Sequence, residues 1–357
     1  MTSNDPRDLD GKRLQQAMQS LGRNPVLRSR MVALLREWEP EIACEGAVRD
    51  EVTGPIIDAL HLDTDEYEKV LADGSRFQFL YRTKIARDFL LAPNEHPSHV
   101  WEPQTTKLLL ELSRGLTGDV LVGGAYFGDQ AVLVARAVAD AGLTVHCFEP
   151  NAQQARMLRR NLELNQLDNA VVNEVGLWSQ SGEHMKLDGF DSFANMVAGS
   201  AGEGGFETTT IDDYVRHQGV RVGLIQLDIE GAELAALQGA RGVLAQHGPD
   251  VVFELHRSYV DWSDGLRATP VCRLLLDLGY TLFAVRDINS HREMPGQPVE
   301  LIPLDSVFLE GPPHGFNMLA LRDPGRIHGP AWRIVEGVSP KLLPHRSPRL
   351  HHPVGGF

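Results

Sequence analysis

Between about residues 100 and 325, short apolar runs alternate with segments that have the spacing of amphipathic helices. The apolar runs include "GDVLVGGA", "LTVHCFEP", "VGLIQLDIEG" and "PDVVFELH". Strands that are apolar along their whole length are buried on both faces, as in a parallel sheet that helices cover on both sides. The alternation therefore predicts an α/β fold built on a mostly parallel sheet.

This pattern divides the 357 residues into three regions. Residues 1–95 are expected to be mainly helical, with "DEYEKVLA" continuing the helices and a short β-element near residues 73–83. Residues 96–325 form the α/β domain, and its glycine-rich insertion at 186–209 is expected to be a lid or a long hairpin loop. Residues 326–357 are rich in Pro, His and Gly and are predicted to be an extended C-terminal tail.

The segment "VGGAYFG" is a glycine-rich turn between a predicted strand and a predicted helix. Gly123, Gly124 and Gly128 omit side chains where the backbone turns sharply or approaches a ligand. Open parallel sheets bind ligands at the carboxyl ends of their strands. Glu149 ends the next strand, where a carboxylate can accept hydrogen bonds from both ribose hydroxyls of a nucleoside.

NAD and S-adenosylmethionine are both compatible with a glycine turn followed by an acid. Alternatively, the glycines serve only tight packing of the strand against the helix. A dinucleotide places its pyrophosphate on the helix N-terminus and needs the spacing G-x-G-x-x-G. Here Ala125 replaces the middle glycine, and bulky Tyr126 and Phe127 follow it. A methyl donor has no phosphate, so the less open turn favours S-adenosylmethionine weakly.

Several motifs together resemble the FkbM family of S-adenosylmethionine-dependent methyltransferases. They are "GGAYFGDQA", "CFEPNAQQARMLRRNLELN", "TTTIDDY", "LIQLDIEGAELAALQGA", "VFELH" and "FNMLAL". The resemblance covers roughly residues 95–325. It implies a class I methyltransferase (Rossmann-like) fold, with a seven-stranded, mostly parallel sheet and an antiparallel C-terminal hairpin. It also implies methyl transfer from S-adenosylmethionine to oxygen, commonly to a hydroxyl of a sugar or natural product, with S-adenosylhomocysteine as the product.

The resemblance also implies a set of cofactor-binding residues. The turn would line the methionine end of the donor, Glu149 would bind the ribose and Asn151 would lie near the adenosine. Gly176 follows the next strand and would flank the adenine, with strand-end packing as the alternative. Family members usually have Asn where this chain has Tyr126, so a ring or hydroxyl could approach the donor instead. The turn residues assigned to the donor are Gly123, Gly124, Ala125, Tyr126 and Gly128.

Asp228, Glu254 and His256 are the candidate catalytic residues because they follow predicted strands at the cofactor edge. A hydroxyl acceptor needs a group that takes its proton. Asp228 could be that base, a metal ligand, a contact for the donor's ammonium group or the N-cap of the next helix. Glu254 and His256 are two positions apart, so they share one face of a strand. The same three residues could hold a divalent metal, but a site without metal is the preferred interpretation.

The remaining expectations concern partners and location. The net charge of −14 disfavours nucleic acid as a partner. Three widely spaced cysteines, a polar N-terminus and the lack of a long apolar run predict a cytoplasmic protein with no membrane segment. The N-terminal region is expected to cover the site or to form a homodimer interface. The alternatives to a methyltransferase are an NAD-dependent oxidoreductase and a non-catalytic binding module on the same fold.

Overall fold

The computed structural model describes residues 6–189, 195–199, 205–310 and 315–357. The chain divides into two compact units, which we treat separately: unit 1 is residues 1–68 and 79–91, and unit 2 is residues 69–78 and 92–357. The predicted border at residue 95 lies near the observed border at residues 91 and 92. The segment 326–357, predicted as a tail, belongs to unit 2.

Unit 1 is mainly helical, as the sequence indicates. Asn24 starts α2 by accepting hydrogen bonds from the main-chain N–H groups of Val26 and Leu27. A small core forms from Val32, Leu35, Ile57 and Leu60. The helices of this unit are α1 (Pro6–Gly22), α2 (Pro25–Trp38), α3 (Gly54–Asp58) and α4 (Lys84–Leu90).

The prediction that "DEYEKVLA" is helical is wrong. This segment contains strand β1 (Glu66–Val70), which forms a two-stranded sheet with β2 (Arg76–Leu80). β2 confirms the β-element predicted near residues 73–83. Gly74 adopts φ +85° in the connecting turn, and the Asp73 side chain accepts a hydrogen bond from the Ser75 main-chain N–H. Pairing between the two strands therefore outweighs the local helical pattern.

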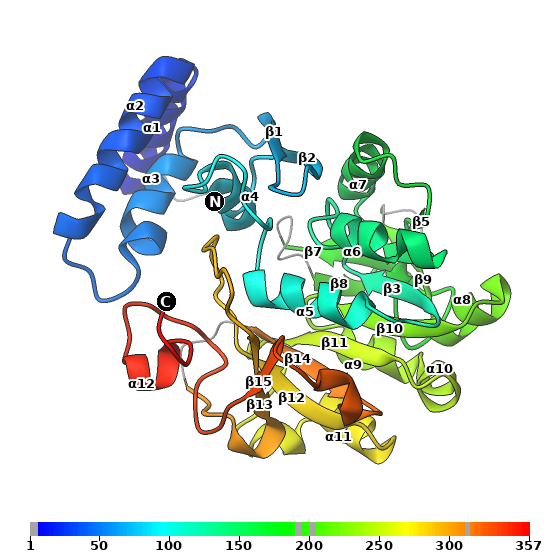
Figure 1. Cartoon of the computed structure of the whole chain (residues 1–357). Helices are drawn as coiled ribbons and strands as arrows, with labels where there is room; N and C mark the ends of the chain where they lie inside the picture. The colour runs from blue at the N-terminus through cyan, green and yellow to red at the C-terminus, as the bar shows by residue number, and fades with distance from the viewer. Residues whose placement is uncertain (1–5, 190–194, 200–204, 311–314) are drawn as a thin grey trace. The chain divides into compact units, whose positions relative to one another are not determined.

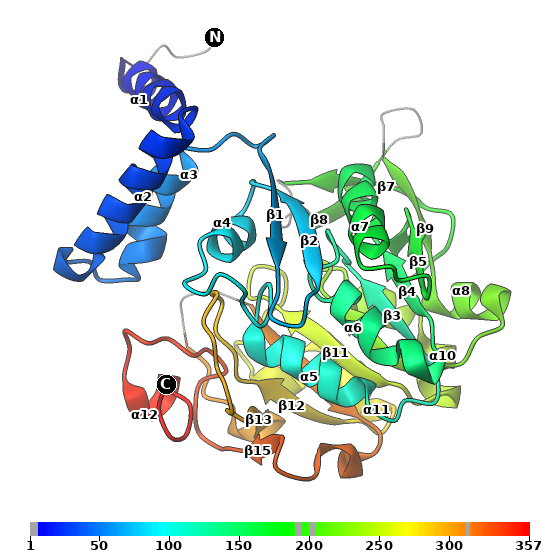
Figure 2. The same cartoon turned by 45° about the horizontal axis from the view of Figure 1, so that its top comes forward.

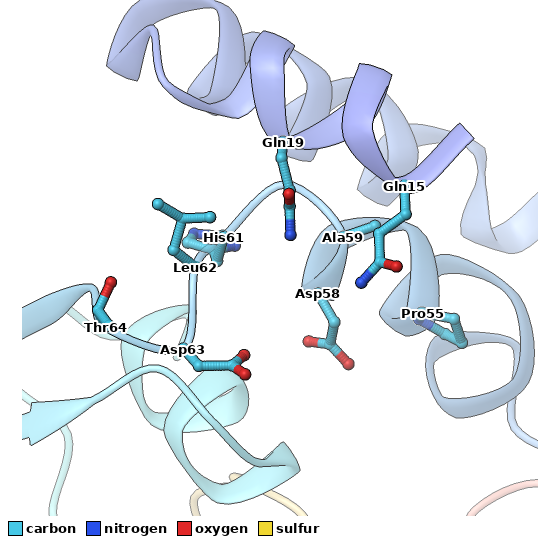
Figure 3. Close-up of a pocket in the computed structure, with 9 residues that line it drawn as sticks. All are labelled: Gln15, Gln19, Pro55, Asp58, Ala59, His61, Leu62, Asp63 and Thr64. Atoms are coloured by element: carbon cyan, nitrogen blue, oxygen red, sulfur yellow. The ribbon is translucent and has the colours of Figure 1, made fainter. Parts of the chain in front are cut away.

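A cavity of about 550 Å³ lies within unit 1 (Figure 3). One of its carboxylates, Asp58, already pairs with Arg87 at 2.6 Å and accepts a hydrogen bond from the Tyr81 hydroxyl at 2.8 Å. None of the predicted site residues lines this cavity. Its lining residues are Gln15, Gln19, Pro55, Asp58, Ala59, His61, Leu62, Asp63 and Thr64.

Unit 2 is built on a large sheet that has nine strands within the described residues. Their order is β15-β13-β12-β14-β11-β10-β3-β4-β5 (Figure 1). The strands are β3 (Asp119–Gly123), β4 (Val145–Phe148), β5 (Ala170–Asn173), β10 (Val222–Leu227), β11 (Asp250–Leu255), β12 (Thr281–Val285), β13 (Val299–Pro303), β14 (Phe316–Leu321) and β15 (Trp332–Ile334). Strands β5, β4, β3, β10 and β11 are parallel, and this order is that of a Rossmann-like sheet.

The α/β class is confirmed, but the predicted number of strands in the sheet is wrong. The large sheet has nine strands rather than seven, because β13 and β15 extend it beyond β12. The predicted antiparallel C-terminal strands are present: β12 pairs antiparallel with β14 on one side and with β13 on the other. A second, four-stranded sheet consists of β6 (Gly176–Leu177), β7 (His184–Asp188), β8 (Asn195–Ala198) and β9 (Phe206–Thr209).

The insertion predicted at 186–209 supplies β8 and most of β9, so part of it belongs to that small sheet. The lid or loop interpretation of its remaining parts, residues 190–194 and 200–204, falls outside the described residues.

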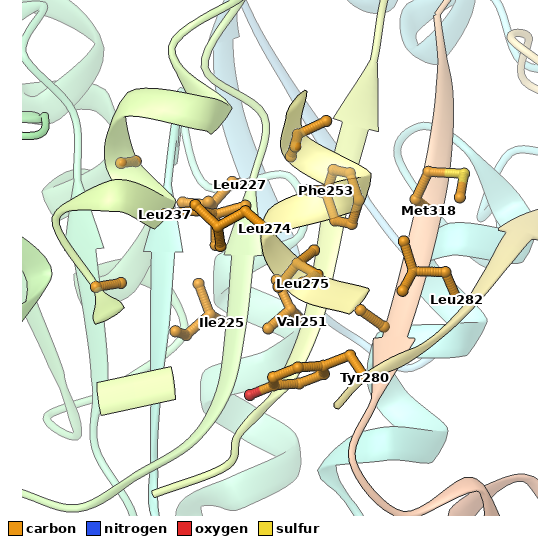
Figure 4. Close-up of a cluster of buried hydrophobic side chains, with 14 of the residues drawn as sticks. Ile225, Leu227, Leu237, Val251, Phe253, Leu274, Leu275, Tyr280, Leu282 and Met318 are labelled. Atoms are coloured by element: carbon orange, nitrogen blue, oxygen red, sulfur yellow. The ribbon is translucent and has the colours of Figure 1, made fainter. Parts of the chain in front are cut away.

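Helices cover both faces of the large sheet (Figure 2). Helices α5 and α6 pack together, while α8 to α11 enclose the main hydrophobic cluster (Figure 4). In that cluster Ile225 and Leu227 of β10 meet Leu237 of α9 and Leu275 of α11. The helices of unit 2 are α5 (Pro103–Ser113), α6 (Ala131–Val138), α7 (Ala152–Leu164), α8 (Ile211–Gln218), α9 (Glu233–Gln238), α10 (Arg241–Gln246), α11 (Pro270–Asp277) and α12 (Pro348–His351).

The C-terminal segment is tied to the sheet by a buried arginine. The Arg286 guanidinium, which is fully buried, pairs with Glu300 at 2.5 Å and donates hydrogen bonds to the carbonyls of Ser339 and Leu350. The segment also supplies β15 and α12. It is therefore a part of unit 2 with its own secondary structure rather than a loose extension.

Candidate functional site

Four neighbouring parallel strands end together at one edge of the large sheet. Gly123, the last residue of β3, has Phe148 of β4 and Leu227 of β10 as its partners, and Leu227 is paired with Phe253 of β11. The strand order reverses between β3 and β10, and folds of this kind bind ligands at such a point. The next residues along the four strands are all predicted site residues: Gly124, Glu149, Asp228 and Glu254.

Gly124 is required by the contact between the ends of β3 and β10. It adopts φ +75°, and a Cβ atom at this position would lie 1.7 Å from the carbonyl oxygen of Asp228. The N–H groups of Gly124 and Ala125 donate to the carbonyl oxygen of Phe148 at 3.0 and 3.2 Å. The turn is thus pressed between the ends of β4 and β10, and a side chain at residue 124 cannot be accommodated.

Tyr126 links the turn to Glu149 through its main chain. Its φ of +48° lies in the left-handed region, which Asn tolerates better than Tyr. This conformation directs the Tyr126 N–H to Glu149 Oε2 at 2.8 Å. The family's usual Asn therefore suits the backbone conformation, and a polar side chain is not needed to make this bond.

The Glu149 carboxylate is buried and fixed at both oxygens. Oε2 accepts from Tyr126, and Oε1 accepts from the Asn151 main-chain N–H at 2.9 Å. A carboxylate oxygen can accept more than one hydrogen bond, so this anchoring leaves the chemistry of a ribose-binding acid intact. The Asn151 side chain caps α7 by accepting from the N–H groups of Gln153 and Gln154. Its predicted place near adenosine stays a prediction.

The other glycines assigned to the donor are needed for packing between protein segments. A Cβ at Gly123 would lie 2.9 Å from side-chain carbons of Leu177 and Leu227. At Gly128 it would lie 2.6 Å from Leu158. At Gly176 it would lie 2.6 Å from the Phe206 ring. For these three positions the structure supports the packing alternative, and their contact with a donor stays a prediction.

Three carboxylates converge beside the turn. One oxygen from each of Asp228, Glu230 and Glu254 lies within 4.8 Å of the others. Burial raises the pKa of Asp228 to about 6, and burial together with the Asp228 charge raises the pKa of Glu230 to about 8. Burial and the same two neighbours raise the pKa of Glu254 well above its ordinary value. Holding negative charge on these neighbouring buried carboxylates costs free energy, and a bound cation would lower that cost.

The loop after β10 holds Glu230 in an unusual conformation. Glu230 adopts φ +49° and Gly231 φ +96°. Glu233 braces this turn by accepting from the N–H groups of Ile229 at 2.9 Å and Gly231 at 3.1 Å. The cap position of α9 is Ala232, which makes no side-chain cap bond, so the N-cap alternative for Asp228 is wrong. Left-handed non-glycine residues concentrate at functional sites.

His256 does not join Asp228 and Glu254, in contrast to the predicted trio. Within the described residues the cluster around those two acids contains Glu230 instead. His256 Nδ1 accepts a hydrogen bond from the Ser258 main-chain N–H at 3.1 Å. Partial burial, with a contribution from Lys341, lowers the pKa of His256, so the ring is neutral at pH 7.

Glu102 and Asn317 belong to the site, although the sequence analysis did not select them as site residues. Glu102 is buried, adopts φ +47° and accepts a hydrogen bond from the Asn317 side-chain amide at 2.9 Å. Burial, Asp287 and Asp228 together raise the pKa of Glu102 well above its ordinary value. In the sheet, Asn317 is the cross-strand partner of Glu254. The "FNMLAL" motif could have indicated Asn317, because Asn317 is its second residue and pairs with Glu254, a predicted site residue.

Asp129 and Lys341 add two further charges. Burial and the Asp228 charge raise the pKa of Asp129, which follows the glycine turn, to about 7. Lys341 is buried, and its main chain forms an isolated parallel β-bridge with Asp287, the second residue beyond β12. Burial lowers its pKa to about 8, and it interacts electrostatically with Glu254. Lys341 lies in the C-terminal segment, where no local motif indicates a site residue.

The carboxylate trio could also hold a hard divalent cation, because magnesium and manganese prefer oxygen ligands. The predicted metal set of Asp228, Glu254 and His256 has to be corrected, since Glu230 takes the place of His256.

A Rossmann-like sheet with a glycine turn at its switch point and an acid on the adjoining strand defines a class of proteins that bind nucleosides or nucleotides. Residues 123–282 match the family model described as "Methyltransferase FkbM domain". The match covers less than half of the chain and lies within the region whose motifs resemble this family. The match includes Glu149, Asp228 and Glu254 but ends before Asn317 and Lys341. A comparison with curated proteins gives no significant match.

Solved structures also resemble the chain. The methyltransferase FkbM from Methylobacillus flagellatus KT is 17% identical, with a TM-score of 0.33, over 57% of this chain and 43% of that protein. An S-adenosylmethionine-dependent O-methyltransferase from Thermotoga maritima is 12% identical, with a TM-score of 0.35, over 73% and 94%. These scores are too low to carry an argument, so the fold class rests on the strand order. No helix in the described part of the chain is long and apolar enough to cross a membrane.

Proposed function

We propose that the protein is an S-adenosylmethionine-dependent O-methyltransferase that acts on a hydroxyl group of a small molecule, either a natural product or a sugar. S-adenosylmethionine, when bound, supplies an electrophilic methyl group. The observation that carries the choice of cofactor is the concentration of carboxylates around the glycine turn. Asp129 directly follows Gly128, and Asp228 interacts with it electrostatically.

These charges oppose the pyrophosphate of a dinucleotide, which would need the start of α6 for itself. They suit the ammonium and sulfonium groups at the methionine end of the methyl donor, which outnumber its single carboxylate. The main-chain N–H groups of Tyr126 and Asn151 hold the Glu149 carboxylate in place, and this carboxylate would accept hydrogen bonds from the ribose. The NAD hypothesis therefore fits the local charge less well than the methyl-donor hypothesis.

The same acids suit proton removal from a hydroxyl acceptor. A carboxylate whose pKa is raised toward the working pH is a stronger base than an ordinary one. Asp228, with a pKa of about 6, is ionised at pH 7 and lies beside the cofactor turn. We assign it as the candidate base and assign Glu254, as a neutral acid, to a hydrogen bond with the acceptor. His256 would act at the rim, since the cluster does not include it.

Calorimetric titration tests the cofactor class. S-adenosylhomocysteine should bind with one-to-one stoichiometry, and NAD should not bind. Binding of NAD alone would establish the oxidoreductase alternative, and binding of neither would favour a non-catalytic module. Incubation of a small-molecule extract with methyl-labelled donor, followed by mass spectrometry, would then identify the acceptor and the atom that receives the methyl group.

A further inference from the structure

A second cluster of ligating side chains lies apart from the acidic trio. His99 belongs to the segment between α4 and α5, while His291 and Glu293 belong to the connection between β12 and β13. One ligating atom from each of the three residues lies within 4.8 Å of the other two. Segments almost 200 positions apart in sequence thus bring two imidazoles and a carboxylate together.

Both imidazoles are buried, with exposed fractions of 2% for His99 and 6% for His291. The His99 Nε2 atom is buried and has no hydrogen-bond partner among the described residues. Leaving such a group unsatisfied costs about 1–3 kcal/mol, and natural proteins rarely accept this cost without a reason. An ordered water or a bound ion would satisfy this nitrogen.

The groups around the cluster orient its members. His291 Nε2 lies 2.8 Å from the carbonyl oxygen of His99, so Nε2–H donates and the lone pair is on Nδ1. The Glu293 carboxylate accepts hydrogen bonds from the main-chain N–H and the hydroxyl of Ser98, at 2.8 and 2.5 Å. Metal-binding histidines and carboxylates are typically held in this way by carbonyls and by hydrogen-bond donors.

We propose that His99, His291 and Glu293 form a binding site for a zinc-type divalent metal ion. Two histidines and one carboxylate are a ligand set that zinc adopts, with a fourth position open to water. The two rings stack with centroids 4.3 Å apart and an angle of 11° between planes, so their lone pairs lie in two nearly parallel planes and do not meet at one point. Metal binding therefore requires one ring to turn. His99 Nε2 has no bond to lose, but turning this ring breaks the 3.0 Å contact between its Nδ1 and Ser98 Oγ.

The proposed site would fasten the segment that carries Glu102. His99 lies three residues before Glu102, and Asp287, four residues before His291, binds the N–H groups of Gln104 and Thr105 at the start of α5. A metal between His99 and His291 would join the same two segments a second time. The role is structural and does not depend on the proposed methyl transfer.

Calorimetric titration of the metal-free, full-length protein with zinc chloride tests the proposal. We expect one zinc per chain and an affinity that falls more than about 100-fold in His99→Ala and in His291→Ala, since even outer partners are worth 10–100-fold. His96→Ala is the matched control, because His96 lies in the same segment and is exposed. X-ray absorption of the zinc-loaded protein should show two imidazole ligands.

Failure to bind zinc, or equal binding by wild type and His99→Ala, would overturn the proposal. Equal binding combined with loss in Glu230→Gln would assign the metal to the acidic trio instead. If the buried histidine variants do not fold, Glu293→Gln provides the test at a partly exposed position, with an expected loss of more than about 10-fold. Zinc should also raise the Tm of the wild type more than that of Glu293→Gln.

Discussion

The main-chain N–H of Tyr126 donates a hydrogen bond of 2.8 Å to Oε2 of Glu149, so the glycine turn after β3 and the acid after β4 form one unit. The bond depends on the left-handed conformation of Tyr126, at φ +48°. In the sequence, the turn and the acid are separate motifs, and the structure shows that the backbone of one positions the carboxylate of the other.

Because this bond comes from the main chain, Tyr126→Asn should retain donor binding. Asn tolerates the left-handed region and keeps the N–H. We expect the Kd for S-adenosylhomocysteine to change less than about 3-fold, which is under 1 kcal/mol. Tyr126→Pro, which has no N–H and cannot adopt φ +48°, should lose binding. A loss of 10-fold or more in the Asn variant would show that the Tyr126 ring contacts the donor.

Glu149→Ala should weaken binding of S-adenosylhomocysteine by at least about 100-fold, because it removes the acceptor of two ribose hydrogen bonds worth about 1.5–3 kcal/mol each when charged. It also leaves the N–H groups of Tyr126 and Asn151 without their acceptor, so the free energy of unfolding should fall. Titration calorimetry and urea unfolding measure the two effects. Asn24→Ala is the control: it removes the side-chain cap of α2, at about 1 kcal/mol, and changes no predicted site residue. Unchanged affinity in Glu149→Ala would refute the ribose assignment.

The strands and helices that could be predicted are those with a strong local pattern. The apolar strands β3, β4, β10 and β11 and the turn after β3 follow directly from short segments of sequence. β1 did not, because its five residues are only partly buried and their partner β2 lies beyond a turn. The C-terminal segment was predicted to be loose because its composition does not reveal that Arg286, more than 50 residues earlier, binds its carbonyls.

The same distinction holds for the site. Glu149, Asp228 and Glu254 could be predicted because each follows a recognisable strand of the parallel sheet. Glu230 was not among the predicted site residues, since only the left-handed turn at Glu230 brings its carboxylate to the cluster. Glu102 and Lys341 come from segments outside the matched domain, and their place depends on tertiary contacts.

The acidic trio should make the protein less stable as the pH rises. Glu230 has a folded-state pKa of about 8, above its ordinary value near 4.5, so the folded protein holds this proton more tightly than the unfolded chain. The resulting stability is fully present below about pH 4 and is lost as the pH rises to about 8. Glu230→Gln should therefore gain Tm relative to the wild type between pH 4 and 8 in thermal unfolding. Glu163→Gln, at an exposed helix position, should show no pH-dependent difference, and parallel curves for Glu230→Gln would contradict the raised pKa.

Asp228→Asn should weaken the binding of the donor, S-adenosylmethionine, more than the binding of its product, S-adenosylhomocysteine. S-adenosylmethionine carries a sulfonium charge that S-adenosylhomocysteine lacks, so a nearby carboxylate favours the former. At pH 7.5, where Asp228 with its pKa of about 6 is ionised, the variant should lose more affinity for S-adenosylmethionine than for S-adenosylhomocysteine. At pH 5 the difference should shrink, because the wild-type carboxyl is then largely protonated. Equal losses for both ligands would place Asp228 away from the sulfonium.

Gly124→Ala should destabilise the protein far more than a glycine substitution with the same backbone conformation elsewhere. Gly115 and Gly124 have φ values of +72° and +75°, so alanine pays a similar left-handed penalty of about 1–2 kcal/mol at both. A Cβ at Gly115 meets nothing within 4 Å, whereas at Gly124 it would lie 1.7 Å from the Asp228 carbonyl oxygen. Only Gly124→Ala must separate the ends of β3 and β10. Urea unfolding should therefore show a free energy of unfolding at least about 4 kcal/mol below that of the wild type, or the variant should not fold. Equal losses in the two variants would mean that these strand ends move apart easily, and the close crossing at the cofactor edge would then not explain why residue 124 is glycine.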